Sequence, residues 1–204
     1  ANAYGEMAHR RVGGQGIAVS DLDNNGDEDL YISTFYNKGY DLPNLLYLQN
    51  NGVFQEEAAT RGVNDQAFSY QSLSGDFDND GDNDLFVVNY HSSSYPSAPN
   101  RLLLNNGAGS FVDQSGNLSG NTASDSKSAV MLDIENDGDL DVVVVNNAAA
   151  HQVYVNDGNA RFNVQTRGLE NFRSGGHSYQ GVAAGDMNQD GFQDLVLVHS
   201  SGGF

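Results

Sequence analysis

The chain has 204 residues, no cysteine and a formal net charge of −18, so a disulfide framework is excluded. Its nine basic residues are scattered and form no stripe, which argues against binding to nucleic acid. No apolar run approaches the roughly 18 residues of a membrane-spanning helix, and no signal peptide is visible, so we expect no membrane insertion and a mature chain or a fragment.

The first predicted unit begins with a run of small residues over 16–20, which predicts a strand in a confined place. An acidic loop follows at 21–29 (DLDNNGDED), and the β-branched run LYIST over 30–34 predicts a buried strand. The alternating segment NLLYLQNNGVF over 44–54 predicts a hairpin, because Asn-Gly between alternating apolar residues is a strong hairpin signal. The unit is therefore predicted to contain four antiparallel strands, with the acidic loop between the first two.

The same order of elements returns along the chain. Acidic loops recur at 76–84, 133–141 and 186–194, so the first residues of successive loops are 55, 57 and 53 positions apart (76−21, 133−76 and 186−133). Hairpins are predicted at 100–111 and 151–162, and no helix pattern is found. The predicted units cover about 10–63, 64–120 and 121–170, with a partial unit over 171–204.

Four strands per repeat at this period predict an all-β fold, a β-propeller of four-stranded antiparallel blades. The last unit has no predicted hairpin after the apolar strand at 195–199, so the outer edge of that strand would lack cover. Exposed strand edges recruit other strands. We therefore expect either further sequence after Phe204 or pairing with another copy, and a head-to-tail contact that does not close would give a filament.

Each acidic loop follows the pattern D-x-[DNE]-x-[DN]-G-x-x-D, which we number from position 1 to position 9. Oxygens at positions 1, 3 and 5 can all turn inward in a tightly curled loop, and glycine at position 6 permits the bend. Position 7 would offer its backbone carbonyl, and position 9 is always aspartate. Such a set of oxygens suits Ca²⁺, whereas Mg²⁺ retains its waters and requires a smaller octahedron.

We therefore predict about four Ca²⁺ ions, one in each loop. The predicted ligands of the first two loops are Asp21, Asp23, Asn25, Asp27 and Asp29, followed by Asp76, Asp78, Asp80, Asp82 and Asp84. Those of the last two are Asp133, Glu135, Asp137, Asp139 and Asp141, followed by Asp186, Asn188, Asp190, Phe192 and Asp194. The position-7 residues, which would bind through their backbone carbonyls, are Asp27, Asp82, Asp139 and Phe192.

Two other interpretations of the loops are weaker. Polar turns also favour Asp, Asn and Gly, but four copies with one internal spacing favour a metal site. An EF-hand would need a glutamate at position 12 and flanking helices. Position 12 is instead apolar in every loop, and strands are predicted on both sides. The loops hold 18 of the 27 acidic residues (five, five, five and three), so most of the charge belongs to these candidate sites.

The order strand, DxDxDGxxDL loop, strand and N-x-L-Y-x-N-x-G-x-x-F hairpin resembles the FG-GAP or VCBS repeat. That repeat forms the blades of integrin α-chain propellers and of many secreted propellers. The resemblance implies a propeller, more often of about seven blades, with one Ca²⁺ per intact loop and an extracellular or cell-surface location. Glu135 departs from the usual Asp or Asn at position 3. The resemblance names no ligand, because the ligands of such repeats vary widely.

The loops at the other end of the predicted strands carry aromatic side chains. Exposed aromatics beside Asn, Ser and His suit contact with a glycan or a protein, and the alternative is that these rings pack between blades. The candidate ligand-binding residues are Tyr36, Tyr40, Tyr90, His91 and Tyr95.

No nucleophile motif is present, and the five histidines repeat at no blade position, so catalysis is disfavoured. The sequence predicts an extracellular calcium-stabilised module for adhesion, recognition or scaffolding, with a protein or glycan partner. One alternative is an accessory or catalytic domain of a secreted polysaccharide lyase or hydrolase. Another is a homo-oligomeric subunit of a surface filament.

Overall fold

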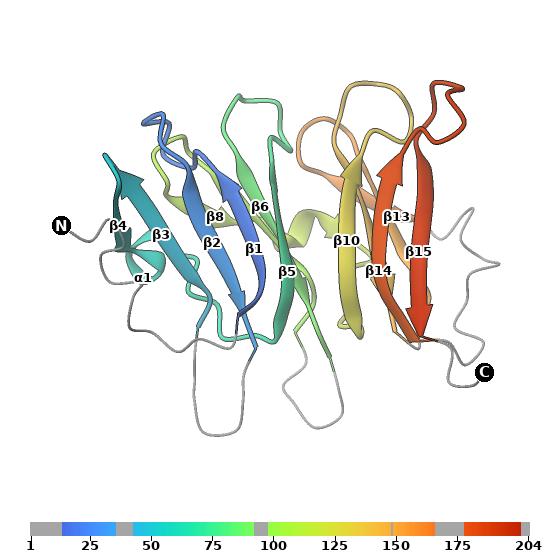
Figure 1. Cartoon of the computed structure of the whole chain (residues 1–204), viewed down its shortest axis with the longest axis horizontal. Helices are drawn as coiled ribbons and strands as arrows, with labels where there is room; N and C mark the ends of the chain where they lie inside the picture. Colours follow the sequence, from blue (N-terminus) through green and yellow to red (C-terminus); the bar gives the residue numbers. More distant parts are fainter. Residues whose placement is uncertain (1–13, 36–42, 92–97, 148, 166–177, 201–204) are drawn as a thin grey trace.

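The computed structural model describes residues 14–35, 43–91, 98–147, 149–165 and 178–200. Their strands form four separate sheets that stand side by side in chain order (Figure 1). We call these sheets blades. The first and fourth blades lie at opposite ends of the row, so the described residues form an open arc (Figure 1).

The first three blades each contain four antiparallel strands, as predicted. The first blade comprises β1 (Gly14–Ser20), β2 (Asp29–Thr34), β3 (Leu45–Asn50) and β4 (Val53–Glu56). The second comprises β5 (Ser69–Gly75), β6 (Asp84–Asn89), β7 (Arg101–Asn105) and β8 (Phe111–Asp113). The third comprises β10 (Ser126–Leu132), β11 (Asp141–Asn146), β12 (Gln152–Asn156) and β13 (Phe162–Gln165). The fourth contains β14 (Ser178–Gly185) and β15 (Asp194–Ser200).

A short strand from the connection between blades adds to the third blade. This strand, β9 (Leu118–Ser119), pairs in parallel with β13, with Leu118 opposite Phe162 and Ser119 opposite Asn163. Leu118 is buried in the apolar cluster between the second and third blades. The third sheet therefore has five strands in the order β10-β11-β12-β13-β9, and its outer edge is covered by chain that leaves the second blade.

The first strands of the blades pack directly on one another, β1 on β5, β5 on β10 and β10 on β14. A Cβ atom on Gly16 would lie 2.7 Å from the Cα of Gln71, and one on Gly75 would lie 2.8 Å from a methyl of Leu140. At Gly16 the obstacle is the backbone of the next blade, so no larger side chain fits there, whereas at Gly75 the side chains of Leu140 and Met131 would have to shift. The second strands lie between blades, and Val142–Val145 are fully buried, as their β-branched sequence predicts.

The expectation that the chain contains no helix is wrong in two short places. One helical turn, α1 (Ala58–Arg61), follows β4, and a 3₁₀ turn, η2 (Ser115–Asn117), follows β8. The carbonyl of Glu57 accepts hydrogen bonds from Thr60 and Arg61, and Gly62 ends α1 in the left-handed conformation. A single turn has no room for a helical repeat of apolar residues, so no periodicity revealed it.

Within the described residues, β15 pairs with β14 alone. Its side chains Val196 and Val198 are 43% and 59% exposed. The described chain thus leaves the last strand without cover, as the sequence predicted. No helix in the described part of the chain is long and apolar enough to cross a membrane.

Candidate metal centres

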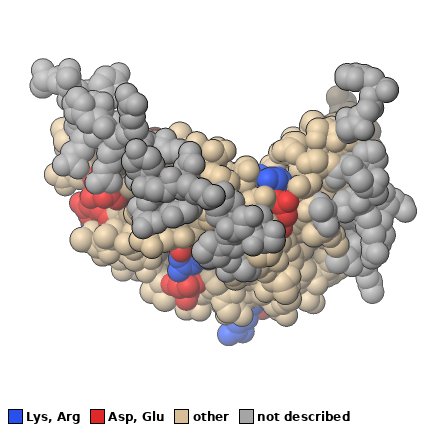
Figure 2. Space-filling model, turned by 90° about the horizontal axis from the view of Figure 1, so that it is seen from below, with Lys and Arg blue, Asp and Glu red and all other residues tan. Residues whose placement is uncertain are grey.

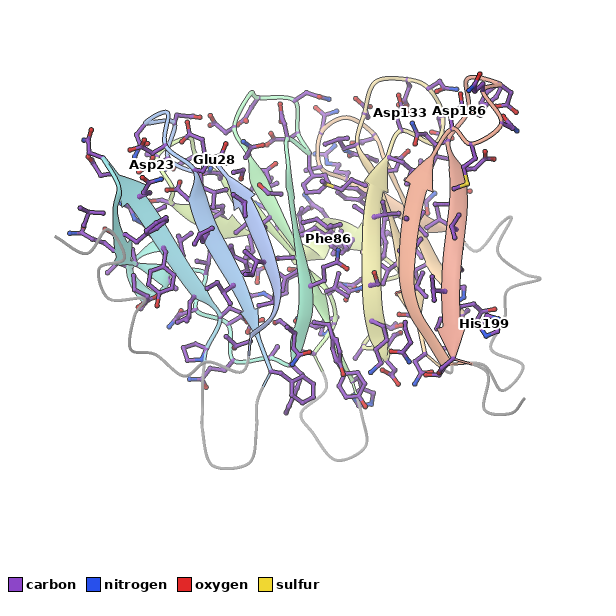
Figure 3. The ribbon with its side chains drawn as sticks, viewed as in Figure 1. Asp23, Glu28, Phe86, Asp133, Asp186 and His199 are labelled. Carbon is purple, nitrogen blue, oxygen red and sulfur yellow. The ribbon has the colours of Figure 1, made fainter. Side chains whose placement is uncertain are left out.

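The four acidic loops lie at the same end of the strands. Figure 3 shows Asp23, Asp133 and Asp186, from the first, third and fourth loops, at the same end of the strands, along the top of the view, with His199 of β15 near the opposite end of the strands. This placement follows from the antiparallel pairing of the first two strands of every blade, β1 with β2, β5 with β6, β10 with β11 and β14 with β15. Each loop joins such a pair, so all four loops are presented on one face.

The carboxylate at position 1 closes each loop on itself. Oδ1 of Asp21 accepts the backbone N–H of Asn25 at 3.1 Å, and Oδ2 accepts that of Gly26 at 2.9 Å. The same two bonds form in the other three loops. The position-6 glycines have φ angles of 89° to 97°, a region that disfavours side chains. The sequence requirement for aspartate at position 1 and glycine at position 6 is therefore met by one repeated geometry.

The aspartate at position 9 ties each complete loop to the third strand of its blade. Oδ2 of Asp84 accepts the N–H of Phe77 at 2.9 Å, and Oδ1 accepts that of Asn105, at the end of β7, at 2.8 Å. Asp29 and Asp141 form equivalent pairs of bonds. All three side chains are buried. In the fourth blade, the described residues give Asp194 a single such donor, the N–H of Met187.

Burial raises the pKa of Asp84 to about 7, although the two backbone N–H donors favour its ionised form. Burial likewise raises the pKa of Asp29 and Asp141, against the same kind of backbone hydrogen bonds. A cation beside these carboxylates would oppose that shift, because it favours the charged form.

Two loops bring three carboxylates together. Ligand oxygens of Asp21, Asp23 and Asp29 lie within 4.8 Å of one another, and so do those of their counterparts in the second loop, Asp76, Asp78 and Asp84. Two carboxylates about 4 Å apart repel by about 4 kcal/mol at an effective dielectric constant near 20. Such clusters therefore favour occupation by a cation.

One carboxylate oxygen of the second loop is placed as a metal ligand would be. Oδ1 of Asp78 is buried and has no hydrogen-bond partner. A buried carboxylate oxygen without a donor is costly unless a cation contacts it. The third loop, with the longer Glu135, and the fourth, with Asn188, bring no three described acidic side chains to the same spacing.

The side chain at position 7 turns away from its own loop. Oδ2 of Asp27 accepts the N–H of Asn51 in the β3–β4 turn at 2.7 Å. The carboxylate of Asp82 lies against the β7–β8 turn, where a Cβ on Gly107 would be 2.5 Å from its Oδ2. The side chains of Asp27 and Asp82 are thus engaged by the hairpin turns, and the backbone carbonyl at position 7 stays a predicted ligand.

Neighbouring loops are joined through this position-7 carboxylate. Nδ2 of Asn24, at position 4 of the first loop, donates to Oδ1 of Asp82 at 2.6 Å and to the carbonyl of Gly107 at 3.2 Å. Nδ2 of Asn79 in the second loop donates to Oδ1 of Asp139 at 2.8 Å and to the carbonyl of Gly158 at 3.2 Å. This contact was not predicted from the sequence, although Asn at position 4 and Asp at position 7 each recur in three loops.

We predict that Gly107→Ala destabilises the protein by about 2 kcal/mol or more. Gly107 has a φ of 74°, where a side chain is strained, and the added methyl would collide with the carboxylate of Asp82. Denaturation in urea measures the change. Gly116→Ala is the matched control, because an added Cβ there has no neighbour within 4 Å. Equal loss in both variants would contradict the prediction.

The candidate ligand-binding residues are only partly described. Tyr36, Tyr40 and Tyr95 lie outside the described residues. Tyr90 is half-buried, and its ring centroid lies 6.1 Å from that of Phe35 and 5.3 Å from that of Tyr70. Tyr90 therefore packs between blades, as the alternative interpretation held.

A lysine of the third blade completes this aromatic cluster. Nζ of Lys127 lies 4.3 Å from the ring centroid of Tyr70 and 4.0 Å from that of Tyr90, and 3.3 Å from Oδ1 of Asp125. The neighbouring His91 is also half-buried, and its backbone N–H bonds the carbonyl of Ser124. Figure 2 views the molecule from this end, where the visible Lys, Arg, Asp and Glu atoms of the described residues form small separate groups.

Lys127→Met is expected to lower stability by about 1–2 kcal/mol. The substitution keeps an apolar stem but removes the ammonium group that contacts two rings and the carboxylate of Asp125. Chemical denaturation at low and high salt checks this, and the loss should shrink as salt rises. A variant as stable as the unaltered protein would show that this cluster does not hold the blades together.

Comparison with known proteins gives one family. The sequence model of the FG-GAP-like repeat matches three overlapping segments, 21–87, 76–144 and 133–197. No curated protein sequence matches the chain significantly. Among solved structures, the chain is similar to a candidate exo-beta-1,3-galactanase from Bifidobacterium bifidum s17, at 8% sequence identity and a TM-score of 0.48. The alignment covers 79% of this chain and 54% of that one, so the chain spans about half the length of that protein. With three repeats matched from residue 21 to residue 197, the chain belongs to the FG-GAP-like repeat family.

Proposed function

We propose that the chain is a calcium-stabilised propeller module. The observation that carries this proposal is the second loop, where three carboxylates converge within 4.8 Å and the buried Oδ1 of Asp78 has no hydrogen-bond partner. Calcium would neutralise the repulsion in this loop and satisfy that oxygen. Its all-oxygen donor set suits calcium better than zinc or copper, which prefer nitrogen or sulfur ligands.

The side chains at positions 1, 3, 5 and 9 and the backbone carbonyl at position 7 would hold the ion in each loop. In the first and second loops these side chains include the two carboxylate clusters. Glu135 in the third loop and Asn188 in the fourth replace the aspartate at position 3. We therefore expect the first two loops to bind calcium more tightly than the other two, since more of their carboxylates already converge.

We further propose an extracellular or cell-surface role in adhesion, recognition or scaffolding. Calcium loops of extracellular modules typically bind with dissociation constants of about 10⁻⁴ to 10⁻³ M, which matches the calcium supply outside cells. The arc of blades could then form part of a larger ring, and its ends would present surfaces to a protein or a glycan. The candidate recognition residues are Tyr36, Tyr40 and Tyr95, which lie outside the described residues and which the sequence predicts at the end of the strands opposite the acidic loops.

Counting bound metal tests the calcium proposal directly. Native mass spectrometry after dialysis against millimolar calcium, followed by elemental analysis, should show about four calcium ions per chain. Asp76→Ala should remove one ion, and Asp27→Ala should remove none, because the Asp27 side chain bonds Asn51 instead. Binding of no calcium by the unaltered chain would refute the proposal.

A glycan array with the calcium-loaded protein tests recognition. A variant with Ala at Tyr36, Tyr40 and Tyr95 should lose binding, whereas Val112→Ala, an exposed position on β8, should retain it. Equal binding by all three proteins would reject this surface. Release of new reducing ends or unsaturated sugars would favour the polysaccharide-enzyme alternative, and calcium-dependent growth of particles in light scattering would favour the filament.

A further inference from the structure

The contacts between neighbouring loops connect positions that belong to different candidate metal centres. Asn24 stands between positions 3 and 5 of the first loop, both of which carry predicted ligands. Its side chain ends on the carboxylate of Asp82, whose own backbone carbonyl is a predicted ligand of the second loop. Asn79 and Asp139 repeat this connection between the second and third loops. Each hydrogen bond therefore spans two sites.

The local geometry makes this connection stiff. Asn24 and Asn79 both have left-handed backbone conformations, with φ angles of 57° and 60°, so the loop curl fixes the direction of the side chain. Each amide also donates to the carbonyl of the glycine against which the aspartate rests, Gly107 or Gly158. A cation that orders positions 3 and 5 of one loop thereby orders position 7 of the next.

The series stops before the fourth loop. Position 4 of the third loop is Asn136, whose backbone has the same left-handed conformation, with a φ of 54°. Position 7 of the fourth loop is Phe192, which cannot accept a hydrogen bond and is 60% exposed. Within the described residues, the hydrogen bonds of the fourth loop connect it to no neighbouring loop.

We propose that the first three loops bind calcium as a coupled series, whereas the fourth binds independently; this inference rests on the proposed calcium function. Asn24, Asp82, Asn79 and Asp139 are positioning residues, because they act on the ion through the loop backbone. Coupling between two sites is reciprocal, so occupation of either loop strengthens binding at its neighbour by the same factor. We expect a factor of about fivefold or more between adjacent coupled loops, within the usual range of such coupling.

One further side chain joins the first two loops directly. Nδ2 of Asn83, at position 8 of the second loop, donates to the backbone carbonyl of Asp21 at 3.2 Å. No such bond joins the second and third loops, where position 8 is the apolar Leu140. Removal of the Asp82 carboxylate should therefore leave some coupling between the first pair, and removal of the Asp139 carboxylate should leave less between the second pair.

The position-6 glycines provide one reporter for each loop. The backbone N–H groups of Gly26, Gly81, Gly138 and Gly191 each donate to the position-1 carboxylate that would bind the ion. Calcium titration of the ¹⁵N-labelled full chain, followed by two-dimensional NMR, thus gives a separate midpoint for every loop. The coupling factor is the ratio of the midpoint of one loop with its neighbour disabled to the midpoint with its neighbour intact.

The decisive measurement uses the second and third loops. With the second loop disabled by Asp76→Ala, the Gly138 midpoint should rise about fivefold or more. When Asp76→Ala is combined with Asp139→Ala, the rise of the Gly138 midpoint should stay below about twofold. Asp139→Asn should retain the coupling, because its amide oxygen can still accept a hydrogen bond from Asn79. If Asp76→Ala does not fold, as judged by the Gly138 and Gly191 signals, Asp78→Asn disables the loop more gently.

The fourth loop supplies the converse test. With the third loop disabled by Asp133→Ala, the Gly191 midpoint should move less than about twofold. Phe192→Asp provides an acceptor for Asn136 and should raise this ratio to about fivefold. If the backbone N–H signals of the position-6 glycines did not shift on addition of calcium, the calcium function itself would be refuted. The coupled series would be overturned if disabling one loop left the calcium midpoint of its neighbour unchanged, or if the Asp139→Ala variant kept the full coupling. Either result would leave the calcium-binding proposal in place.

Discussion

Removal of calcium is expected to lower the melting temperature of the protein by about 20 °C or more. When the free calcium concentration is about 100 times the dissociation constant of a site, the bound ion stabilises the native state by about 2.7 kcal/mol. Four such ions together contribute on the order of 10 kcal/mol. That equals the whole stability of an ordinary domain. For a chain of this length, each kcal/mol corresponds to about 2–4 °C. Differential scanning calorimetry in 10 mM calcium and then in excess EGTA measures the shift.

Two aspartates of the same kind of loop separate this effect from general charge effects. Asp76→Ala removes a predicted ligand and the acceptor of two loop N–H groups, so in calcium it should cost about 3 kcal/mol or more. Asp27→Ala removes the same charge but only one hydrogen bond, to Asn51, and should cost about 1 kcal/mol. The difference in stability between the Asp76→Ala and Asp27→Ala variants should be smaller in EGTA than in calcium. A melting temperature that EGTA leaves unchanged would contradict the calcium proposal.

The calcium-free protein should lose stability as pH rises from about 4 to about 7. Burial raises the pKa of Asp84 from 3.8 to about 7 in the native state, so over this range the native chain binds more protons than the unfolded chain. Stability therefore falls with rising pH, by as much as about 4 kcal/mol, at 1.36 kcal/mol per pKa unit. The raised pKa values of Asp29 and Asp141 act in the same direction.

Calcium should reverse this slope, because the ion competes with protons for the same carboxylates. Urea denaturation at pH 4.5, 5.5, 6.5 and 7.5, in EGTA and in calcium, gives the two profiles. Asp84→Asn removes the titrating group at this position and should make the EGTA profile less steep, with the contribution of Asp29 and Asp141 remaining. A rise in stability with pH in EGTA would show that the backbone donors to Asp84, and not its burial, control its ionisation.

The repeated elements could be predicted from the sequence because each has a local cause. Asn51-Gly52 gave the β3–β4 hairpin, where both residues have positive φ angles of 51° and 81°. The valines of 142–145 gave a strand buried on both faces. Aspartate at position 1 and glycine at position 6 gave the curled loops, because both act within six residues of chain.

Features that depend on contact between blades could not be predicted in this way. The bond from Asn24 to Asp82 joins residues 58 positions apart, and each residue alone is a common turn residue. The sequence left open whether Tyr90 contacts a ligand or packs between blades, because its environment depends on Phe35 of one blade and Lys127 of another. Asp29, Asp84 and Asp141 at position 9 each accept a second backbone N–H from the third strand of their blade, 15 to 21 residues away, which no local pattern indicates.

The strand β9 separates the unit of sequence from the unit of structure. Leu118 and Ser119 belong to the second repeat by sequence, yet they form the outermost strand of the third sheet. A gene duplication that copied residues 121–170 would thus yield a blade without its outer strand, which the preceding copy would have to supply. The segments matched to the family begin in one acidic loop and end beyond the next. The segments 21–87 and 76–144 each carry both partners of a loop-to-loop hydrogen bond, so duplication in either frame would copy the contact along with the loops it joins.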